Sequence, residues 1–295
     1  MVLRIADLYM EIAYEEPVTE KLANLKPFAV TKTKPDGQES ICHICAEKPI
    51  SCPMSSPTQT HSAEGKTLHL WVEPDYCTFS LIFHDSGRAY RLQADRRWKS
   101  VKTDLPLCGD EQIEALNDFI MIAFIYSSAF YNTVAVHSSC VATGMNGCAF
   151  IGPSGIGKST HSNLWQRHFS GTRLINDDQP AIRILDNGMP YVYGTPWSGK
   201  TLCYRNDRAE LNALFFMEQA HKNQLVRLSG IETFQRLLKA TSLIGQDTAS
   251  FDAISGTLAK IAGTVPAFLL KNRPDKEAAQ LSHKAFVESI NKQAP

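Results

Sequence analysis

Residues 152–159 read Gly-Pro-Ser-Gly-Ile-Gly-Lys-Ser and match the pattern GxxxxGK[ST] in full. The apolar run CAFI precedes them and a helix-like run follows, which is the strand, loop and helix setting that the pattern requires. Glycines allow such a loop to curl until its N–H groups face a phosphate, and the helix adds the positive end of its dipole. The stretch therefore predicts a P-loop that holds the phosphates of a nucleotide.

The P-loop pattern also assigns roles to single residues. Lys158 is expected to reach the β- and γ-phosphates, and the hydroxyl of Ser159 is expected to bind Mg²⁺. A glycine-rich turn that merely precedes a helix is the alternative, and the flanking strand and helix argue against it. We therefore expect ATP and Mg²⁺ as cofactors. The predicted nucleotide-binding residues are Gly152, Ser154, Gly155, Ile156, Gly157, Lys158, Ser159 and Thr160.

An acidic pair, Asp177 and Asp178, follows soon after the P-loop helix, at the end of a short apolar run. A P-loop enzyme needs a carboxylate near Mg²⁺, and an acid at the carboxyl end of a strand suits that role. Two adjacent carboxylates also allow one to bind the metal while the other accepts a proton from an attacking hydroxyl. We assign Asp178 to the metal with Ser159, although the residue types leave the two acids interchangeable. A solvated turn is the alternative interpretation.

Two further places carry candidate functional residues. His137 lies in the strand before the P-loop strand, where a lone histidine is more often a core residue than a catalytic one. Residues 194–201 read GTPWSGKT, a loop whose glycines, hydroxyls and lysine would suit a phosphate or a substrate. Trp197 and Lys200 are therefore candidate substrate contacts, and a plain connecting loop is equally compatible with the pattern.

The pattern along the chain changes near residue 105. Before it, β-type runs predict strands at 67–73, 77–84 and 88–93, with a hairpin turn at 85–87, and the stretch 31–64 is expected to contain loops. After it, helices and strands alternate. The later predicted strands are 133–142, 148–151, 173–176, 181–185, 191–193, 212–218 and 265–271. One predicted helix ends near residue 132 and a second begins at 158. Two more cover 230–244 and 249–263, and a terminal helix follows Pro274. We expect an α/β protein with a smaller β-rich domain at 1–105 and a P-loop domain at 106–295.

Composition excludes several classes of protein. Lys and Arg number 30 against 30 Asp and Glu, so there is no electrostatic reason to expect a nucleic-acid partner. Eight Cys in 295 residues is below the density of a disulfide scaffold, and acidic residues interrupt the N-terminus where a signal peptide is apolar. The apolar stretch 119–136 contains Ser, Asn and Thr, which favours a buried helix leading into a strand over a membrane span. We expect a reduced, cytoplasmic protein with no membrane partner. The sequence leaves the oligomeric state open, a homo-oligomer included.

Other patterns are weaker. Cys42 and Cys45 form a CxxC motif near Cys52, His61 and His69, a spacing at which two thiolates can share one zinc ion. A second CxxC and a regular HxxxH are absent, so we favour reduced strand and loop cysteines. Candidates for neutralising phosphoryl charge are Arg205, Arg208 and Arg273, although surface arginines are commoner.

Together, His137 ahead of the loop, the loop GPSGIGKS and the pair Asp177-Asp178 resemble the HPr kinase/phosphorylase family and its wider relatives. These proteins share a P-loop fold with ATP-dependent phosphoenolpyruvate carboxykinase. The resemblance covers about residues 130–180 and extends loosely over the rest of the C-terminal half. It implies that the histidine and the acidic pair lie at the metal and phosphoryl-transfer site, with an aspartate activating a serine hydroxyl. Catalytic roles for His137, Lys158, Asp177 and Asp178 follow from it.

The chain also departs from this family. Thr160 follows the P-loop serine where the bacterial regulators usually have Glu, and GTPWSGK occupies the region of their glycine- and arginine-bearing signature. The chain is thus similar to the divergent HPr-kinase-related proteins, and neither HPr as substrate nor the reverse phosphorylase activity is implied.

These observations favour an ATP- and Mg²⁺-dependent phosphotransferase that acts on a hydroxyl acceptor, either a serine of a protein or peptide or a small molecule. A nucleotide-binding switch or regulatory module without turnover is the first alternative, and the lack of an NKxD motif argues against a GTPase. Carboxykinase-like chemistry on a phosphoenolpyruvate-type metabolite is the second, and it follows from the fold relationship alone.

Overall fold

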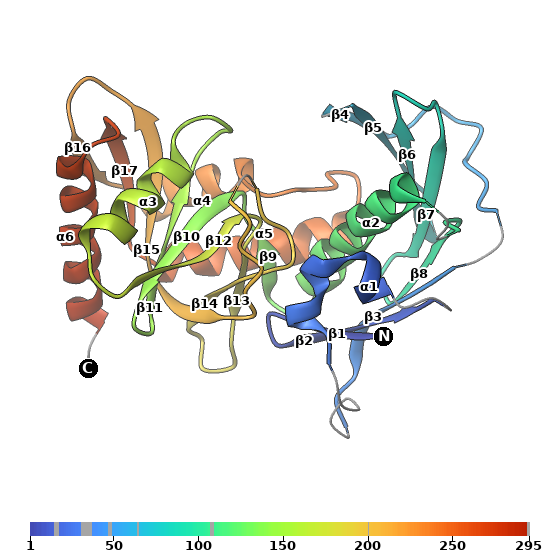
Figure 1. Cartoon of the computed structure of the whole chain (residues 1–295), viewed down its shortest axis with the longest axis horizontal. Helices are drawn as coiled ribbons and strands as arrows, with labels where there is room; N and C mark the ends of the chain where they lie inside the picture. Colours follow the sequence, from blue (N-terminus) through green and yellow to red (C-terminus); the bar gives the residue numbers. More distant parts are fainter. Residues whose placement is uncertain are drawn as a thin grey trace. The chain divides into compact units, whose positions relative to one another are not determined.

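The computed structural model describes residues 1–14, 18–30, 37–46, 49–63, 65–106, 109–199 and 201–293 (Figure 1). The chain forms two compact units. The N-terminal unit comprises Met1–Phe130 and Ile244–Asp252, and the C-terminal unit comprises Tyr131–Leu243 and Ala253–Pro295. This division differs from the boundary at 105 that we expected from the sequence. The long helix after residue 105 and a short segment of the C-terminal half pack with the N-terminal strands instead.

The N-terminal unit contains, in its described residues, an eight-stranded mixed sheet in the order β1-β2-β3-β8-β7-β6-β5-β4. The hairpin predicted at residues 85–87 joins the antiparallel strands β6 and β7. The strands of this eight-stranded sheet are β1 (Val2–Ile5), β2 (Leu8–Ala13), β3 (Ser40–Ala46), β4 (Gln59–Ala63), β5 (Lys66–Val72), β6 (Tyr76–Phe83), β7 (Ala89–Asp95) and β8 (Ser100–Thr103). Its helical segments are α1 (Val18–Lys21), η1 (Ala23–Phe28) and α2 (Asp110–Ala129).

Strands β3 and β4 lie within the stretch 31–64, which we expected to contain loops. Ser40–Ala46 has no regular alternation of buried and exposed residues that would indicate a strand. Strand β3 gains its partners from distant strands, since it pairs in parallel with β2 and β8. Residues three apart in a strand face opposite sides of a sheet. Cys42 and Cys45 therefore do not converge, and no cluster of metal-ligating side chains is found among the described residues.

Helix α2 is buried against aromatic side chains from strand β6 and from the turn between β7 and β8. The ring of Tyr126 stacks on Trp98 at 4.8 Å, and Phe79 lies 5.8 Å from the same indole. Trp98 and Phe119 are fully buried, which is the environment that the apolar stretch 119–136 predicts. Within the described residues, no helix combines the length and the apolar character that a membrane span requires.

The C-terminal unit holds a nine-stranded mixed sheet among its described residues. The path runs β12-β10-β11-β15-β14-β13-β9, and β17 pairs with both β15 and β16. Its strands are β9 (Thr133–Ala135), β10 (Ser138–Thr143), β11 (Asn146–Ile151), β12 (Thr172–Asp178), β13 (Ala181–Ile184), β14 (Pro190–Tyr193), β15 (Arg208–Gln219), β16 (Gln224–Arg227) and β17 (Ala267–Asn272). Its helices are α3 (Lys158–His168), α4 (Gly230–Lys239), α6 (Lys276–Gln293) and most of α5 (Thr248–Thr264).

The strand predicted at 133–142 is two strands. The chain leaves the ladder at Val136 and His137, whose N–H groups donate to the carbonyls of Pro180 and Ala240. These acceptors come from distant segments, so local sequence could not indicate the break. The interruption frees His137 from the sheet just before β10 begins.

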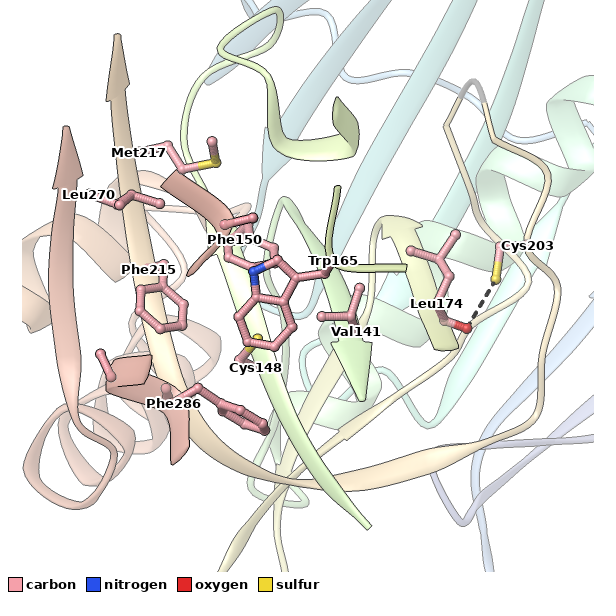
Figure 2. Packing of buried hydrophobic residues seen from close by; sticks show 13 residues of the cluster. Val141, Cys148, Phe150, Trp165, Leu174, Cys203, Phe215, Met217, Leu270 and Phe286 are labelled. Carbon is pink, nitrogen blue, oxygen red and sulfur yellow. Dashed lines mark hydrogen bonds between the residues drawn. The ribbon is translucent and has the colours of Figure 1, made fainter. Parts of the chain in front are cut away.

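An aromatic core fixes helix α3 on strand β11 (Figure 2). The indole of Trp165 lies 5.4 Å from Phe150 and 5.3 Å from Phe286, and Phe150 stacks on Phe215 at 5.5 Å. Truncating one of these buried rings to Ala would cost about 3–5 kcal/mol. Because α3 starts where the P-loop ends, this core also sets the position of the loop.

Candidate active site

Strand pairing brings the predicted site together at one edge of the C-terminal sheet. Ser138 at the start of β10 is paired with Ile151 at the end of β11 and with Asp178 at the end of β12. His137, the P-loop and the acidic pair directly adjoin these paired positions. Three separate sequence motifs therefore meet because β10 runs antiparallel to both neighbours.

The P-loop connects β11 to α3. Gly155 and Gly157 have φ values of 79° and 108°, which side chains rarely tolerate. The backbone therefore requires glycine at Gly157, a fixed position of the motif, and at Gly155, a variable one. The amide of His161 donates to the carbonyl of Gly157 at 2.9 Å, which closes the first turn of the helix. The N-terminus of α3 thus lies directly behind the loop, the arrangement in which a helix dipole favours an anion.

The side chains of the P-loop divide between core and solvent. Ile156 packs against the hydrophobic core of the unit, while Ser154 and Thr160 are exposed and Ser159 is half-buried. Ser159 therefore stays a candidate for binding a cation, since its hydroxyl is not enclosed by the core.

Lys158 is turned back toward the loop and is buried. Its ammonium donates to the carbonyls of Gly152 at 2.8 Å and Pro153 at 3.1 Å, and lies 2.9 Å from Nε2 of His137. Burial lowers the pKa of Lys158, while the negative charges of Asp178 and Asp177 raise it. Burial outweighs the acids, so the net direction is a lowered pKa of Lys158.

His137 links Lys158 to an acid. An ammonium group can only donate, so Nε2 of His137 is the acceptor, and the ring proton lies on Nδ1, which is 3.0 Å from Oδ1 of Asp178. The chain Asp178, His137, Lys158 therefore has one consistent direction of donation. Both His137 and Asp178 are about one-third exposed, so solvent or a ligand can reach this chain of contacts.

Asp177 differs from its neighbour. Its side chain is only 5% exposed, and Oδ2 is buried without a hydrogen-bond partner in the described part of the chain. Leaving a buried charged oxygen unpaired is costly. A donor hydroxyl at this oxygen would remove that cost. The Mg²⁺ that the P-loop implies would be held by Ser159 and Asp178, whose half-buried hydroxyl and one-third exposed carboxylate are the oxygen donors that Mg²⁺ prefers, so the residues present fit it.

The segment after Gly194 is held against the acidic pair. The amide of Gly199 donates to the carbonyl of Asp177 at 2.9 Å, and a Cβ at Gly199 would lie 2.8 Å from that oxygen. Trp197 is 6% exposed, so its ring offers little surface to a substrate. Lys200, the other candidate in this loop, lies outside the described residues.

The candidate arginines differ in their surroundings. Arg208 lies at the start of β15, at the opposite end of the sheet from the site because β15 runs parallel to β11, and its guanidinium lies over Tyr191. Arg273 forms ion pairs with Asp275 and Glu277 and also lines a cavity beside the loop glycines Gly155 and Gly157. The third, Arg205, approaches Gly194 through its backbone carbonyl.

Sequence reasoning missed the role of Asn176. Its amide nitrogen donates to the carbonyls of Thr195 and Trp197, and its oxygen accepts from the amides of Asp178 and Gln179. The side chain thus braces the acidic pair against the following loop. An amide residue directly before two acids at a strand end was the available signal, but its partners lie too far along the chain to be inferred.

Comparison with known proteins finds likenesses among solved structures. No protein-family model and no curated protein sequence matches the chain. Among solved structures, the chain is similar to the Hpr(Ser) kinase/phosphatase from Coxiella burnetii, with 13% sequence identity and a TM-score of 0.32. The match covers 54% of this chain and 94% of that chain.

Proposed function

We propose that the chain is an ATP- and Mg²⁺-dependent phosphotransferase that acts on a hydroxyl acceptor. The observation that carries the proposal is the unpaired carboxylate oxygen of Asp177 beside the P-loop and the Asp178, His137, Lys158 chain. Such an acid can accept the proton of an attacking hydroxyl, a step that nucleotide binding alone does not include. Bound ATP would supply the phosphoryl group, and Mg²⁺ would neutralise part of its charge.

The side chains divide the work by their positions. Lys158 brings a positive charge to the loop, and the N-terminus of α3 adds backbone N–H groups. Asp178 holds the proton of His137 on Nδ1 and so fixes the orientation of the ring. Asp177 is the acid that accepts the proton of an attacking hydroxyl, and Ser159 and Asp178 would hold the cation. Positioning and electrostatic stabilisation supply most of the rate in such reactions.

The test is phosphoryl transfer by the whole chain. The protein is incubated with Mg²⁺ and ATP labelled at the γ-phosphate, together with serine-containing peptides and small alcohols, and with no acceptor as the control. We expect label on an acceptor with wild type and none with Asp177→Asn. ATP turnover that proceeds equally fast without an acceptor, and never labels one, would overturn the kinase proposal.

Calorimetry separates this proposal from a regulatory module. If Asp177→Asn and Asp178→Asn bind ATP and Mg²⁺ as wild type does, and wild type shows no turnover with any acceptor, a nucleotide-binding switch is the better description. Lys158→Met is the control for lost nucleotide binding, because it removes the positive charge at the loop.

A further inference from the structure

The ring of His137 directs a lone pair at the lysine of the P-loop. Because the ammonium of Lys158 can only donate, the lone pair of Nε2 faces it at 2.9 Å. The same ammonium donates to the carbonyls of Gly152 and Pro153 at the start of the loop. Atoms that share one donor lie within about 6 Å of each other, so Nε2 borders the loop that would hold the phosphates.

Two contacts fix the ring of His137 in this orientation. Oδ1 of Asp178 lies 3.0 Å from Nδ1, the ring nitrogen that carries the proton, and the backbone N–H of His137 donates to the carbonyl of Ala240 at 2.8 Å. A nucleophile that a neighbouring group orients is the arrangement used in covalent catalysis. A carboxylate opposite Nδ1 also stabilises the positive charge that the ring gains when Nε2 forms a bond.

A ligand can reach the ring of His137. Its side chain is 35% exposed and that of Asp178 is 33% exposed. His161, the histidine in the first turn of α3, is 1% exposed and is closed to any ligand. Of these two histidines next to the P-loop, His137 is thus the one with an accessible ring and an oriented lone pair.

We propose that His137 takes the phosphoryl group of ATP onto Nε2 before the acceptor receives it, so that transfer proceeds through a phosphohistidine. The inference rests on the proposed function, because it takes the phosphates to lie on the P-loop. It divides one transfer into two displacements at phosphorus, each with its own residues.

The two displacements balance as follows. In the first, the lone pair of Nε2 forms a bond to the γ-phosphorus, and the bond from that phosphorus to the bridging oxygen breaks as ADP leaves. Phosphate oxygens replace Nε2 as acceptors of Lys158, the proton stays on Nδ1, and Asp178 balances the positive charge of the ring. In the second, the acceptor oxygen bonds to phosphorus, its proton passes to Asp177, and the electrons of the phosphorus–nitrogen bond return to Nε2.

The test follows the γ-phosphate of ATP in the absence of an acceptor. The whole chain is mixed with Mg²⁺ and γ-labelled ATP and quenched in alkali, because a phosphorus–nitrogen bond survives alkali and is cleaved by acid. We expect label at His137 by mass spectrometry, lost in mild acid and returned to ATP by added ADP. His137→Gln should carry no label. His168→Gln, an exposed position in the last turn of α3, is the matched control and should be labelled as wild type is.

Asp177→Asn separates the two steps and does not depend on the folding of His137→Gln. It removes the proton acceptor of the second displacement alone, so the labelled protein should accumulate, and an added acceptor should discharge it about a thousandfold more slowly than it discharges wild type.

Two results would overturn the inference and leave the proposed function standing. One is label that reaches an acceptor while none is found on the protein, in wild type at any time after mixing or in Asp177→Asn, which would mean that His137 only positions Lys158. The other is label on the protein that survives acid, as on a serine. No label on either the protein or an acceptor would overturn both.

Discussion

Two buried aspartates, one in each unit, differ in how their oxygens are paired. Asp247 of the N-terminal unit is fully buried, and its oxygens accept from Arg96 and from the hydroxyl of Ser250, both at 2.7 Å. Asp177 of the C-terminal unit is nearly as buried, yet Oδ2 has no partner within the described residues. The same side chain thus serves two purposes. A fully paired carboxylate holds a segment in place. Burying an unpaired carboxylate oxygen is unfavourable in free energy, and a ligand that pairs with it removes that penalty.

Among the substitutions that test this difference between the two aspartates, Asp177→Asn has the largest expected effect. Phosphoryl transfer should fall at least about a thousandfold, because a positioned acid or base contributes up to four orders of magnitude. The free energy of unfolding should not decrease, since the substitution removes a buried charge that lacks a partner. Initial rates and urea unfolding measure the two quantities. Asp186→Asn, in an exposed turn, is the matched control and should change neither. A large loss of stability in Asp177→Asn would mean that its carboxylate is structural.

Arg96→Met should affect stability instead. The substitution leaves Asp247 buried with Ser250 as a remaining partner, and the free energy of unfolding of the protein should fall by about 3 kcal/mol. Arg96 is itself 26% exposed, so the value lies at the low end of the range for buried pairs. Urea unfolding measures it, with Arg88→Met as the exposed control. An unchanged urea midpoint would show that the ion pair between Arg96 and Asp247 does not hold the segment Ile244–Asp252 in place.

His161 is intermediate, since Nε2 lies 2.9 Å from Oγ of Ser282 while the buried Nδ1 has no hydrogen-bond partner among the described residues. Burial lowers the pKa of its ring from 6.5 to about 4, while Asp275 raises it slightly. The unfolded chain therefore binds the proton first as the pH falls, so stability is full above about pH 6.5 and is lost toward pH 4. Between pH 7 and pH 5 the loss should be about 2 kcal/mol. His161→Gln should lack this component, and equal pH slopes for the two proteins would contradict the prediction.

Gly199→Ala should give the smallest effect. The new Cβ would lie 2.8 Å from the carbonyl of Asp177 and 3.4 Å from Cβ of Asp178, so the acidic pair must shift. A displacement of catalytic groups by a fraction of an ångström should lower the rate about tenfold. Gly256→Ala in helix α5 is the control, because its Cβ meets open space and Ala favours the helix. A wild-type rate in Gly199→Ala would show that the loop does not position the acids.

Much of the C-terminal unit could be predicted from the sequence. The P-loop, helix α3 and the strands on either side of it follow from contiguous residues whose periodicity and glycine spacing are local signals. The N-terminal unit was harder, because β3 is recognised through parallel pairing with β2 and β8, which are distant in sequence. The membership of Ile244–Asp252 in that unit depends on the Arg96 and Asp247 pair, which joins residues far apart in the chain.

The sequence alone determined the glycine-rich loop at residues 152–159, since eight consecutive residues carry both its glycines and its side chains. It also indicated an α/β protein with a β-rich N-terminal part, because strand and helix periods are local. Only the tertiary structure decided that His137 bridges Lys158 and Asp178, that Oδ2 of Asp177 lacks a partner within the described residues, and that Ser282 contacts one ring nitrogen of His161. These features depend on strand pairing and on contacts between distant segments, and no local pattern in the chain encodes them.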